Sequence, residues 1–194
     1  MTPYILTLFA SLLAYIIGSF PTGKIIAHSY GIDIEKVGSG NVGATNLARV
    51  VGKKAGLITL LVDVLKGTIV VLIARFFEIE VALSIAVVLG HCYSLPGLKG
   101  GKGVATALGV ILALSPLLGI IALAIFALVF SLTRYVSASS VTAGLLVPVI
   151  AFFLYPHEPF DLSLAIIGLI LTIRHRENLE RLVMGTEKKF SFAS

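Results

Sequence analysis

Long apolar runs recur along this sequence from its first residues to residue 173, and they constrain the fold more than any other feature. At about 1.5 Å of helix per residue, several of these runs could cross the roughly 30 Å hydrocarbon core of a bilayer. The chain has 194 residues, of which 57% are hydrophobic and only 13% are charged. A soluble domain of this length needs more charge to cover its surface. We therefore predict an all-α integral membrane protein in which residues 1–194 form a single membrane-embedded domain.

Seven apolar segments are expected to be membrane helices. The run from Gly103 to Thr133 would be about 46 Å long as one helix, and Ser115 and Pro116 in its middle should end or kink it. We divide the run there, although its first part would be about 16 Å long and would not cross a bilayer alone. The predicted segments are 3–22, 55–77, 81–97, 104–114, 116–133, 136–155 and 160–173.

The distribution of basic residues supports this division and predicts an orientation. Thirteen of the fifteen Lys and Arg residues, all but Lys66 and Arg75, fall on one side of the membrane if there are seven segments. They lie in the C-terminal tail or in the connections on that side. The opposite connections contain Glu78, Glu80 and Glu158 but neither Lys nor Arg. Because basic residues are retained in the cytoplasm, the N-terminus should be outside and the C-terminus cytoplasmic. Topology then explains the net charge of +5, and we expect no nucleic-acid partner.

Four polar stretches fall on the cytoplasmic side: the loop 24–54, the loop 98–103, the short connection around 134–140 and the tail from 174. The first of them is rich in glycine. Residues 38–43 match G-x-G-x-x-G but lack the βαβ context of a dinucleotide site. Glycine still lets backbone N–H groups approach an anion, and a helix N-terminus adds a favourable dipole. Ser39 or Asn41 could cap a short helix that carries Thr45 and Arg49 on one polar face. The stretch is compatible with an anion site or with a flexible loop and an interfacial helix.

The second stretch, from Lys99 to Thr106, places three glycines around a lysine at the start of a predicted helix. It is not a Walker A loop, because Pro96 and Gly103 stand where that motif needs Gly and Ser or Thr. N–H donors, the helix dipole and the Lys102 ammonium could together hold a phosphate. The alternative is a glycine turn with lysines retained by topology.

The start of the C-terminal tail, from Arg174 to Arg181, is also polar. If the last helix continues into it, His175 and Asn178 share a face, and Glu177 can pair with Arg181. A basic segment beside the membrane, attracted to anionic lipid, is an equally good interpretation.

Three other features have more ordinary interpretations. His28 and Asp33 have the His-x4-Asp spacing of acyl-CoA-dependent glycerol-phosphate acyltransferases, but this chain cannot contain the larger α/β catalytic domain of that family. Asp63 and Lys66 lie three residues apart inside a predicted segment, where we expect an ion pair that anchors neighbouring helices. Cys92, the one cysteine, is expected to be a small buried hydrophobe.

Taken together, these stretches resemble the bacterial acyl-phosphate:glycerol-3-phosphate acyltransferase family of the PlsY type. The likeness covers nearly the whole chain, and the motifs occur in the same order. The motifs that carry it are Gly38 to Arg49, Gly90-His91 with Pro96 and Lys99 to Thr106, Arg134 to Ser137 with Ser140, and Arg174 to Asn178 with Arg181.

The resemblance implies transfer of an acyl group from acyl phosphate to the primary hydroxyl of glycerol 3-phosphate, giving lysophosphatidic acid and phosphate. It places a multi-pass enzyme in the bacterial plasma (inner) membrane, surrounded by membrane lipid, with its active site at the cytoplasmic face. It implies activity as a monomer, with no cofactor and no metal. The catalytic residues would be Lys102, Ser140, His175 and Asn178. The substrate-binding residues would be Ser39, Gly40, Asn41, Thr45, Arg49, Gly100, Gly101 and Gly103.

Two functions of other classes are alternatives to this one. A transporter or channel for phosphate or organophosphate often has repeats and broken helices at the membrane midplane, whereas this sequence shows no internal repeat and gathers its polar motifs on one face. The other alternative is a structural subunit of a membrane assembly, and incorporation of labelled glycerol 3-phosphate into lipid by purified protein would separate all three.

Overall fold

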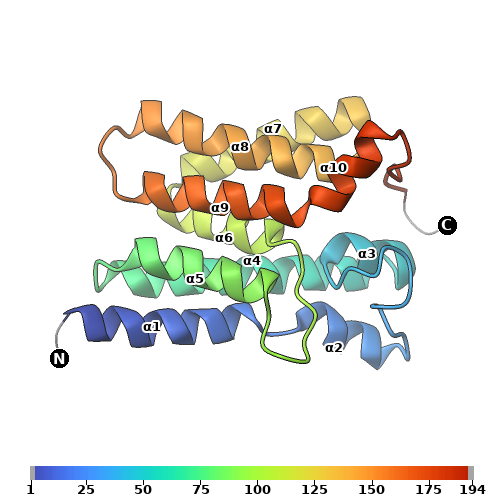
Figure 1. Ribbon diagram of the computed structural model, residues 1–194, viewed down its shortest axis with the longest axis horizontal. Helices are drawn as coiled ribbons and strands as arrows, with labels where there is room; N and C mark the ends of the chain where they lie inside the picture. Colours follow the sequence, from blue (N-terminus) through green and yellow to red (C-terminus); the bar gives the residue numbers. More distant parts are fainter. Residues whose placement is uncertain (1–2, 192–194) are drawn as a thin grey trace.

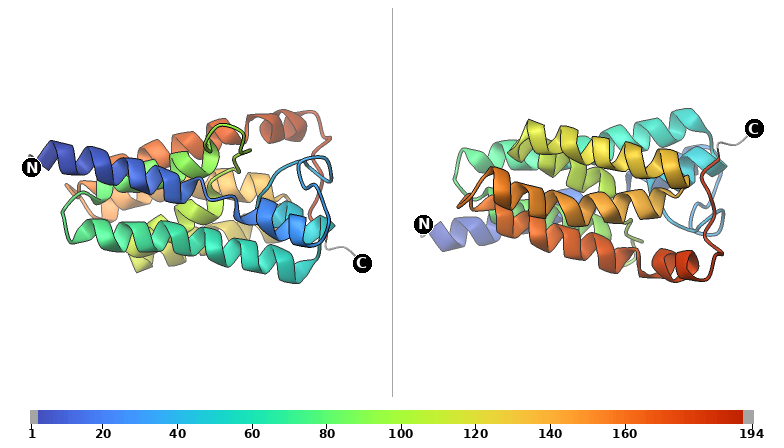
Figure 2. Two further views of the ribbon diagram at one scale, coloured as in Figure 1. Left: turned by 90° about the horizontal axis from the view of Figure 1, so that it is seen from below. Right: turned by 90° about the horizontal axis from the view of Figure 1, so that it is seen from above.

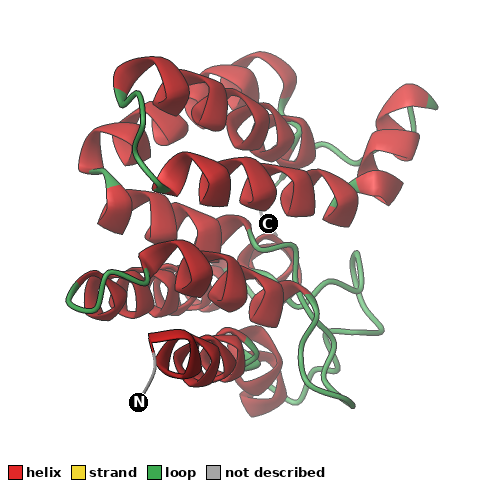
Figure 3. Cartoon of the chain, turned by 60° about the vertical axis from the view of Figure 1, so that its left-hand side comes forward, coloured by secondary structure: helices red, strands yellow, loops and turns green. Residues whose placement is uncertain are grey.

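The computed structural model describes residues 3–191, which form ten helices and no strand (Figure 3). The prediction of an all-α protein is therefore confirmed for the described chain. The helices are α1 (Pro3–Gly18), α2 (Thr22–Ser29), α3 (Ala44–Val50), α4 (Lys53–Arg75), α5 (Glu80–Cys92), α6 (Val104–Leu114), α7 (Pro116–Thr133), α8 (Val136–Leu154), α9 (Phe160–Arg174) and α10 (Arg176–Val183).

The long helices form a bundle in which α1 and α4 to α9 run along the long axis, each in the direction opposite to the one before it (Figure 1). The short helices α2, α3 and α10 all lie at one end of this bundle, opposite to the end where α1 begins (Figure 2). Because the direction alternates, the connections between α3 and α4, α5 and α6, and α7 and α8 meet at that same end. The polar stretches predicted to share one side of a membrane do share one end of the molecule.

Four stretches of the described chain are long and apolar enough to cross a membrane: Tyr4–Ser29, Lys53–Arg75, Pro116–Thr133 and Val136–Leu154. The helices Glu80–Cys92 and Val104–Leu114 are apolar but shorter. Leu132 and Phe153 are examples of the many large apolar side chains that remain exposed on the outer surface. An exterior of this kind is suited to lipid rather than water.

Glycines let several helices pack with their backbones almost in contact. A Cβ atom added at Gly18 of α1 would lie 2.1 Å from the carbonyl oxygen of Val87 in α5. One added at Gly109 of α6 would lie 2.0 Å from the carbonyl oxygen of Val64 in α4. Small residues at helix crossings are typical of membrane bundles, where dispersion contacts rather than hydrophobic burial hold helices together.

The ion pair predicted within α4 is confirmed, with 2.9 Å between Lys66 Nζ and Asp63 Oδ1. Lys66 Nζ also donates hydrogen bonds to the carbonyl oxygens of Gly18 at 3.0 Å and Phe20 at 3.4 Å. The pair therefore does anchor neighbouring helices, because it ties α4 to the end of α1. Cys92 is buried, as expected.

The predicted boundaries were correct where a residue clearly breaks the helix. Ser115 Oγ accepts a hydrogen bond from the N–H of Leu118 at 3.3 Å, and Pro116 opens α7, so the division of the long run is right. Two boundaries were wrong. The predicted segment 3–22 is interrupted, because α1 ends at Gly18 and α2 begins at Thr22, and the predicted segment 81–97 ends as a helix at Cys92. The short helix expected in the first polar stretch is present as α3, and the last long helix ends at Arg174, so that α10 begins only after His175.

Candidate active site

One large cavity of about 1530 Å³ opens at the end of the bundle where the polar stretches meet. Its wall is strongly basic, with eight basic and three acidic side chains. The basic side chains are Arg49, Lys53, Lys99, Lys102, Arg174, Arg176, Arg181 and Lys188, and the acidic ones are Asp63, Glu177 and Glu187. Such a surface concentrates anions by long-range attraction before any specific contact forms.

The cavity brings together nearly every residue predicted for the site. The predicted residues that line it are Ser39, Gly40, Asn41, Thr45, Arg49, Gly100, Lys102, Gly103, Ser140, His175 and Asn178. Gly101 faces a much smaller void behind the loop, which His91 and Asp63 also line. His28 lies on α2 and does not line the cavity.

The buried side chain of Asn46 organises the glycine-rich loop before α3. Its Oδ1 accepts a hydrogen bond from the Ser39 N–H at 2.9 Å, and its Nδ2 donates to the carbonyl oxygens of Val37 at 3.1 Å and Asn41 at 3.0 Å. Gly40 within this loop has φ +65°, a conformation that glycine adopts without strain. The loop therefore has one defined shape rather than being a flexible connection.

The predicted cap of the short helix was wrong. α3 begins at Ala44 with Gly43 as its N-cap, and neither Ser39 nor Asn41 caps it with a side chain. Asn41 Oδ1 instead accepts from the Gly43 N–H at 2.8 Å, which makes a turn just before the helix. Asn41 is thus outside the helix that carries Thr45.

The second glycine-rich loop is held against the ends of α5 and α9. The guanidinium of Arg174 donates to the carbonyl oxygen of Gly101 from Nε at 3.1 Å and from Nη2 at 3.0 Å, and to that of Gly100 at 3.3 Å. The Gly101 N–H donates to the His91 carbonyl oxygen at 2.9 Å, so this donor is already engaged. The N–H groups of the first turn of α6, which begins at Val104, have no partner within the helix and lie beside the cavity.

Lys102 follows this loop and reaches the opposite wall of the cavity. Its ammonium donates a hydrogen bond to Oδ1 of Asn178 on α10. Burial lowers the pKa of Lys102 to about 8, and the nearby Glu187 carboxylate opposes that shift. The ammonium is therefore charged at neutral pH but poorly hydrated, which strengthens its attraction to an anion.

His175, at the junction of α9 and α10, is buried and neutral. Its Nδ1 lies 2.8 Å from the carbonyl oxygen of Leu171. A carbonyl oxygen only accepts, so Nδ1 carries the proton and Nε2 is left as an acceptor. Burial, and then the charge of Lys102, lower the pKa of His175 to about 4.

Glu187 lies at the centre of a hydrogen-bond network that the sequence did not reveal. Its Oε1 accepts from Ser137 Oγ at 2.8 Å and from Asn178 Nδ2 at 2.6 Å, and its Oε2 accepts from Arg181 Nε at 2.7 Å. Burial alone would raise the pKa of Glu187, but these hydrogen bonds outweigh it and hold the pKa below its usual value. The predicted pairing of Arg181 with Glu177 was wrong, because the tail folds back and presents Glu187 instead.

Apolar side chains also line the cavity and form what we call its apolar limb. Its side chains come from α4, α6 and α7, and those of α4 and α7 are partly exposed on the outer surface of the bundle. They are Leu57, Leu60, Leu108, Leu123, Phe126 and Phe130. One cavity thus joins a basic, hydrogen-bonding end to a hydrocarbon-lined end.

The described residues contain no group of three or more His, Cys, Asp and Glu side chains that could hold a metal ion.

Four residues that shape the site were not predicted to do so: Asn46, Ser137, Arg174 and Glu187. The only sequence signal for Glu187 was its position as an acidic residue beside Lys188 and Lys189 in a basic tail.

An all-helical bundle with apolar outer faces and one basic cavity at its end defines a membrane-embedded protein with a site for an anionic, partly apolar molecule. Comparison with known proteins is more specific. The family model described as glycerol-3-phosphate acyltransferase matches residues 8–185. The chain belongs to this family, which confirms the predicted acyltransferase function over that of a transporter.

Proteins named glycerol-3-phosphate acyltransferase from several bacteria are similar to the chain over nearly their whole length. The protein of Trichlorobacter lovleyi is 46% identical, over 91% of this chain and 94% of its own. That of Geobacter sulfurreducens is 44% identical, over 92% of this chain and 94% of its own. That of Aquifex aeolicus is 43% identical, over 94% of this chain and 98% of its own.

Two crystal structures of PlsY (YgiH), an integral membrane glycerol 3-phosphate acyltransferase, have the same fold. The glycerol 3-phosphate form matches with a TM-score of 0.91 and 41% identity, covering 95% of this chain and 96% of that one. The lysophosphatidic acid form matches with a TM-score of 0.88 and 40% identity, covering 95% of both chains. The chain is thus a multi-pass membrane protein and an acyltransferase.

Proposed function

We propose that this enzyme transfers an acyl group from an acyl phosphate to the primary hydroxyl of glycerol 3-phosphate, giving lysophosphatidic acid and inorganic phosphate. The observation that carries the proposal is that one cavity has both a basic part and an apolar limb lined by α4, α6 and α7. A donor that has a phosphate at one end and a hydrocarbon chain at the other matches both parts. Glycerol 3-phosphate, which has no chain, would need only the basic end.

The chemistry follows from the groups around the basic end. The hydroxyl oxygen attacks the carbonyl carbon of the donor, the bond from that carbon to the phosphate oxygen breaks, and phosphate leaves with the electron pair. Lys102 and the first turn of α6 would stabilise the negative charge that grows on the phosphate. Ser140, whose Oγ donates to the Val136 carbonyl oxygen at 2.8 Å, would line the side of the donor. Neither a Ser-His-Asp arrangement nor a covalent acyl-enzyme is required.

Acceptor binding would fall to the other predicted residues. Arg49 and the hydroxyl groups of Thr45 and Ser39 would hold a phosphate, since a guanidinium binds phosphate in a bidentate manner. His175 Nε2 and the side-chain amide of Asn178 would orient the hydroxyl for attack. Bringing two reactants together in this way supplies much of the acceleration when the donor is already activated.

The placement in the membrane is part of the same proposal. We infer that α1 and α4 to α9 are seven membrane helices, with the N-terminus outside and the cavity at the cytoplasmic face of the bacterial plasma membrane. The gathering of basic residues at the cavity end supports this orientation. Reporter domains fused after Lys54 and Lys102 should be cytoplasmic, and one fused near Glu78 should be external. A reporter after Lys102 that was external would overturn the orientation.

The choice of donor can be tested directly. Purified enzyme should incorporate labelled glycerol 3-phosphate into lysophosphatidic acid with acyl phosphate and not with acyl-CoA. Because the site lies within one chain, the monomer separated by size in detergent should be fully active. His28→Ala should keep wild-type activity, since His28 lies away from the cavity. Equal turnover with acyl-CoA would overturn the proposal.

A further inference from the structure

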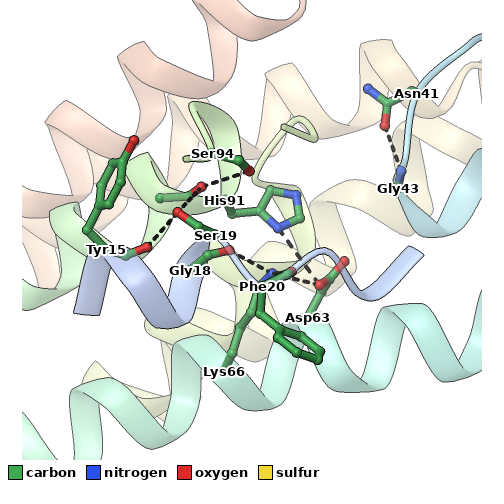
Figure 4. A network of polar contacts seen from close by, with 11 residues as sticks. Tyr15, Gly18, Ser19, Phe20, Asn41, Gly43, Asp63, Lys66, His91 and Ser94 are labelled. Atoms are coloured by element: carbon green, nitrogen blue, oxygen red, sulfur yellow. Dashed lines mark hydrogen bonds and ion pairs between the residues drawn. The ribbon is translucent and has the colours of Figure 1, made fainter. Parts of the chain in front are cut away.

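A buried polar cluster lies directly behind the second glycine-rich loop, and none of the proposed chemical steps uses it. It consists of Asp63, Lys66 and His91, which are 3%, 8% and 7% exposed (Figure 4). Ionisable groups inside a membrane bundle are costly to bury and are retained where they serve function. The ion pair of Asp63 and Lys66 anchors α1, but that role alone gives no reason for a histidine beside it.

The His91 ring is wedged between Asp63 and the glycine-rich loop. On one side, Nδ1 lies 3.8 Å from Asp63 Oδ1. Although Lys66 Nζ is close, no hydrogen bond of acceptable geometry reaches this buried oxygen from any described residue. On the other side, a Cβ atom added at Gly101 would lie 2.2 Å from Nε2 and 3.1 Å from the neighbouring ring carbons Cδ2 and Cε1. The ring edge therefore rests against the backbone of Gly101.

A histidine beside an aspartate at the wall of a cavity suggests a general base, but the geometry of His91 argues against that role. Its Nε2, the nitrogen away from Asp63, lies against Gly101, and the side chain is only 7% exposed, so the ring is placed to support the loop rather than to meet a substrate hydroxyl. The His91 carbonyl oxygen also holds the Gly101 N–H at 2.9 Å. Both the ring and the backbone of His91 thus contact the loop residue that immediately precedes Lys102.

We propose that Asp63, Lys66 and His91 are positioning residues, which fix the position of Lys102 by supporting the backbone of the residue before it, Gly101. Lys66 fixes Asp63 to the end of α1, Asp63 holds the His91 ring, and the ring determines how far Gly101 can move towards α4. The inference rests on the proposed phosphate-binding role of Lys102. A shift of about 1 Å in a group that contacts the reacting atoms can cost about 100-fold in rate, so a rigid support is needed behind a loop made of glycine.

A double-mutant cycle at His91 and Gly101 tests this contact. Gly101 does not adopt a positive φ, so alanine is compatible with its backbone and its Cβ would meet mainly the His91 ring. Gly101→Ala should lower kcat/KM for glycerol 3-phosphate by about 100-fold, and His91→Ala by about tenfold. In the double variant the added methyl group enters the space left by the ring. We expect the double variant to be at least about threefold more active than Gly101→Ala alone. If the two substitutions merely destabilised the protein, the double variant would instead be less active than either single variant.

Ser84→Ala is the matched control, because Ser84 is a fully buried polar residue two turns earlier on α5, away from the loop. It should keep wild-type kcat/KM, and melting temperatures should show that all variants are folded. If His91→Ala does not fold, His91→Asn replaces it in the cycle, since asparagine is too short to reach Gly101.

Lys102→Ala, measured in the same assay, separates this inference from the proposed function. A large loss in Lys102→Ala with recovery in the double variant supports both. A large loss in Lys102→Ala with additive or greater loss in the double variant overturns the positioning role and leaves the phosphate site standing. Wild-type activity in Lys102→Ala overturns the phosphate site itself, and the positioning inference with it.

Discussion

Replacement of Lys102 by alanine is the most direct test of the site. The half-buried Lys102 side chain is a basic group of the second loop that lines the cavity, where it donates to Asn178. Two unit charges about 4 Å apart attract by about 4 kcal/mol at an effective dielectric constant near 20. Loss of one preorganised group of this kind costs about 3–4 kcal/mol, or about 100- to 1,000-fold in turnover. The two figures agree, so we expect Lys102→Ala to lower kcat/KM by at least 100-fold.

The assay is the formation of labelled lysophosphatidic acid by purified enzyme at varied concentrations of both substrates. Lys36→Ala is the control, because Lys36 pairs with Asp33 at 2.9 Å on an exposed surface outside the cavity. It should behave as wild type. The reasoning would be refuted if folded Lys102→Ala stayed within a few-fold of the wild-type kcat/KM.

The pH dependence adds a second, independent readout of the same residue. With a pKa of about 8, Lys102 is charged below pH 8 and loses its proton above it. Since kcat/KM reports the ionisation of free enzyme, it should fall above about pH 8. Lys102→Arg should be less active, because a planar guanidinium does not fit where the ammonium did. Its pH profile should nevertheless stay flat above pH 8, because arginine stays charged throughout that range. An unchanged alkaline limb in Lys102→Arg would assign that limb to another group.

Three further outcomes are expected. Arg49→Ala should raise KM for glycerol 3-phosphate. Arg49→Lys should lower that raised KM only slightly, because an ammonium cannot bind a phosphate in the bidentate manner of a guanidinium. A wild-type KM in Arg49→Lys would contradict this. Asn46→Ala should lower the free energy of unfolding by about 1–3 kcal/mol, because it removes three hydrogen bonds to partly buried backbone groups, and an unchanged melting temperature would contradict it. Between pH 6.5 and about 4 the unfolded chain binds a proton that folded His175 does not, so the melting temperature should fall as the pH drops through that range. His175→Asn should lose this part of the dependence, and an unaltered dependence would assign it elsewhere.

The sequence was most informative where local chemistry decides the structure. Hydrophobic length predicted the bundle, and Ser115 with Pro116 marked a helix boundary that the structure reproduces. It was less informative at residues 93–97, which the predicted segment included although the helix ends at Cys92. Pro96 and Gly97 lie among these residues, and Gly97 adopts φ +82°, which a helix does not allow. A hydropathy pattern reports burial, whereas this helix ends because of its backbone.

The contacts that shape the cavity could not be predicted because they join distant parts of the chain. Glu187 accepts from Ser137, fifty residues earlier, and Arg174 holds carbonyl groups seventy-three and seventy-four residues away. Nothing in the local sequence of a basic tail indicates which carboxylate will fold back into a site. The residue types that bind anions were evident from the motifs, but their supporting partners became evident only from the fold.

The state of His175 bears on where the proton of the attacking hydroxyl goes. A general base works best when its pKa is near the operating pH, and burial holds the pKa of His175 at about 4. The charge of Lys102, the second cause of that low pKa, would be partly offset when a phosphate is bound, but the burial would remain. Nε2 can therefore accept a hydrogen bond from the hydroxyl and orient it, while it remains a poor final acceptor for the proton. The departing phosphate is a stronger base than this imidazole, since phosphate monoesters have a second pKa of about 6. We therefore favour transfer of the proton to the donor's own phosphate, with His175 as the group that aims the hydroxyl.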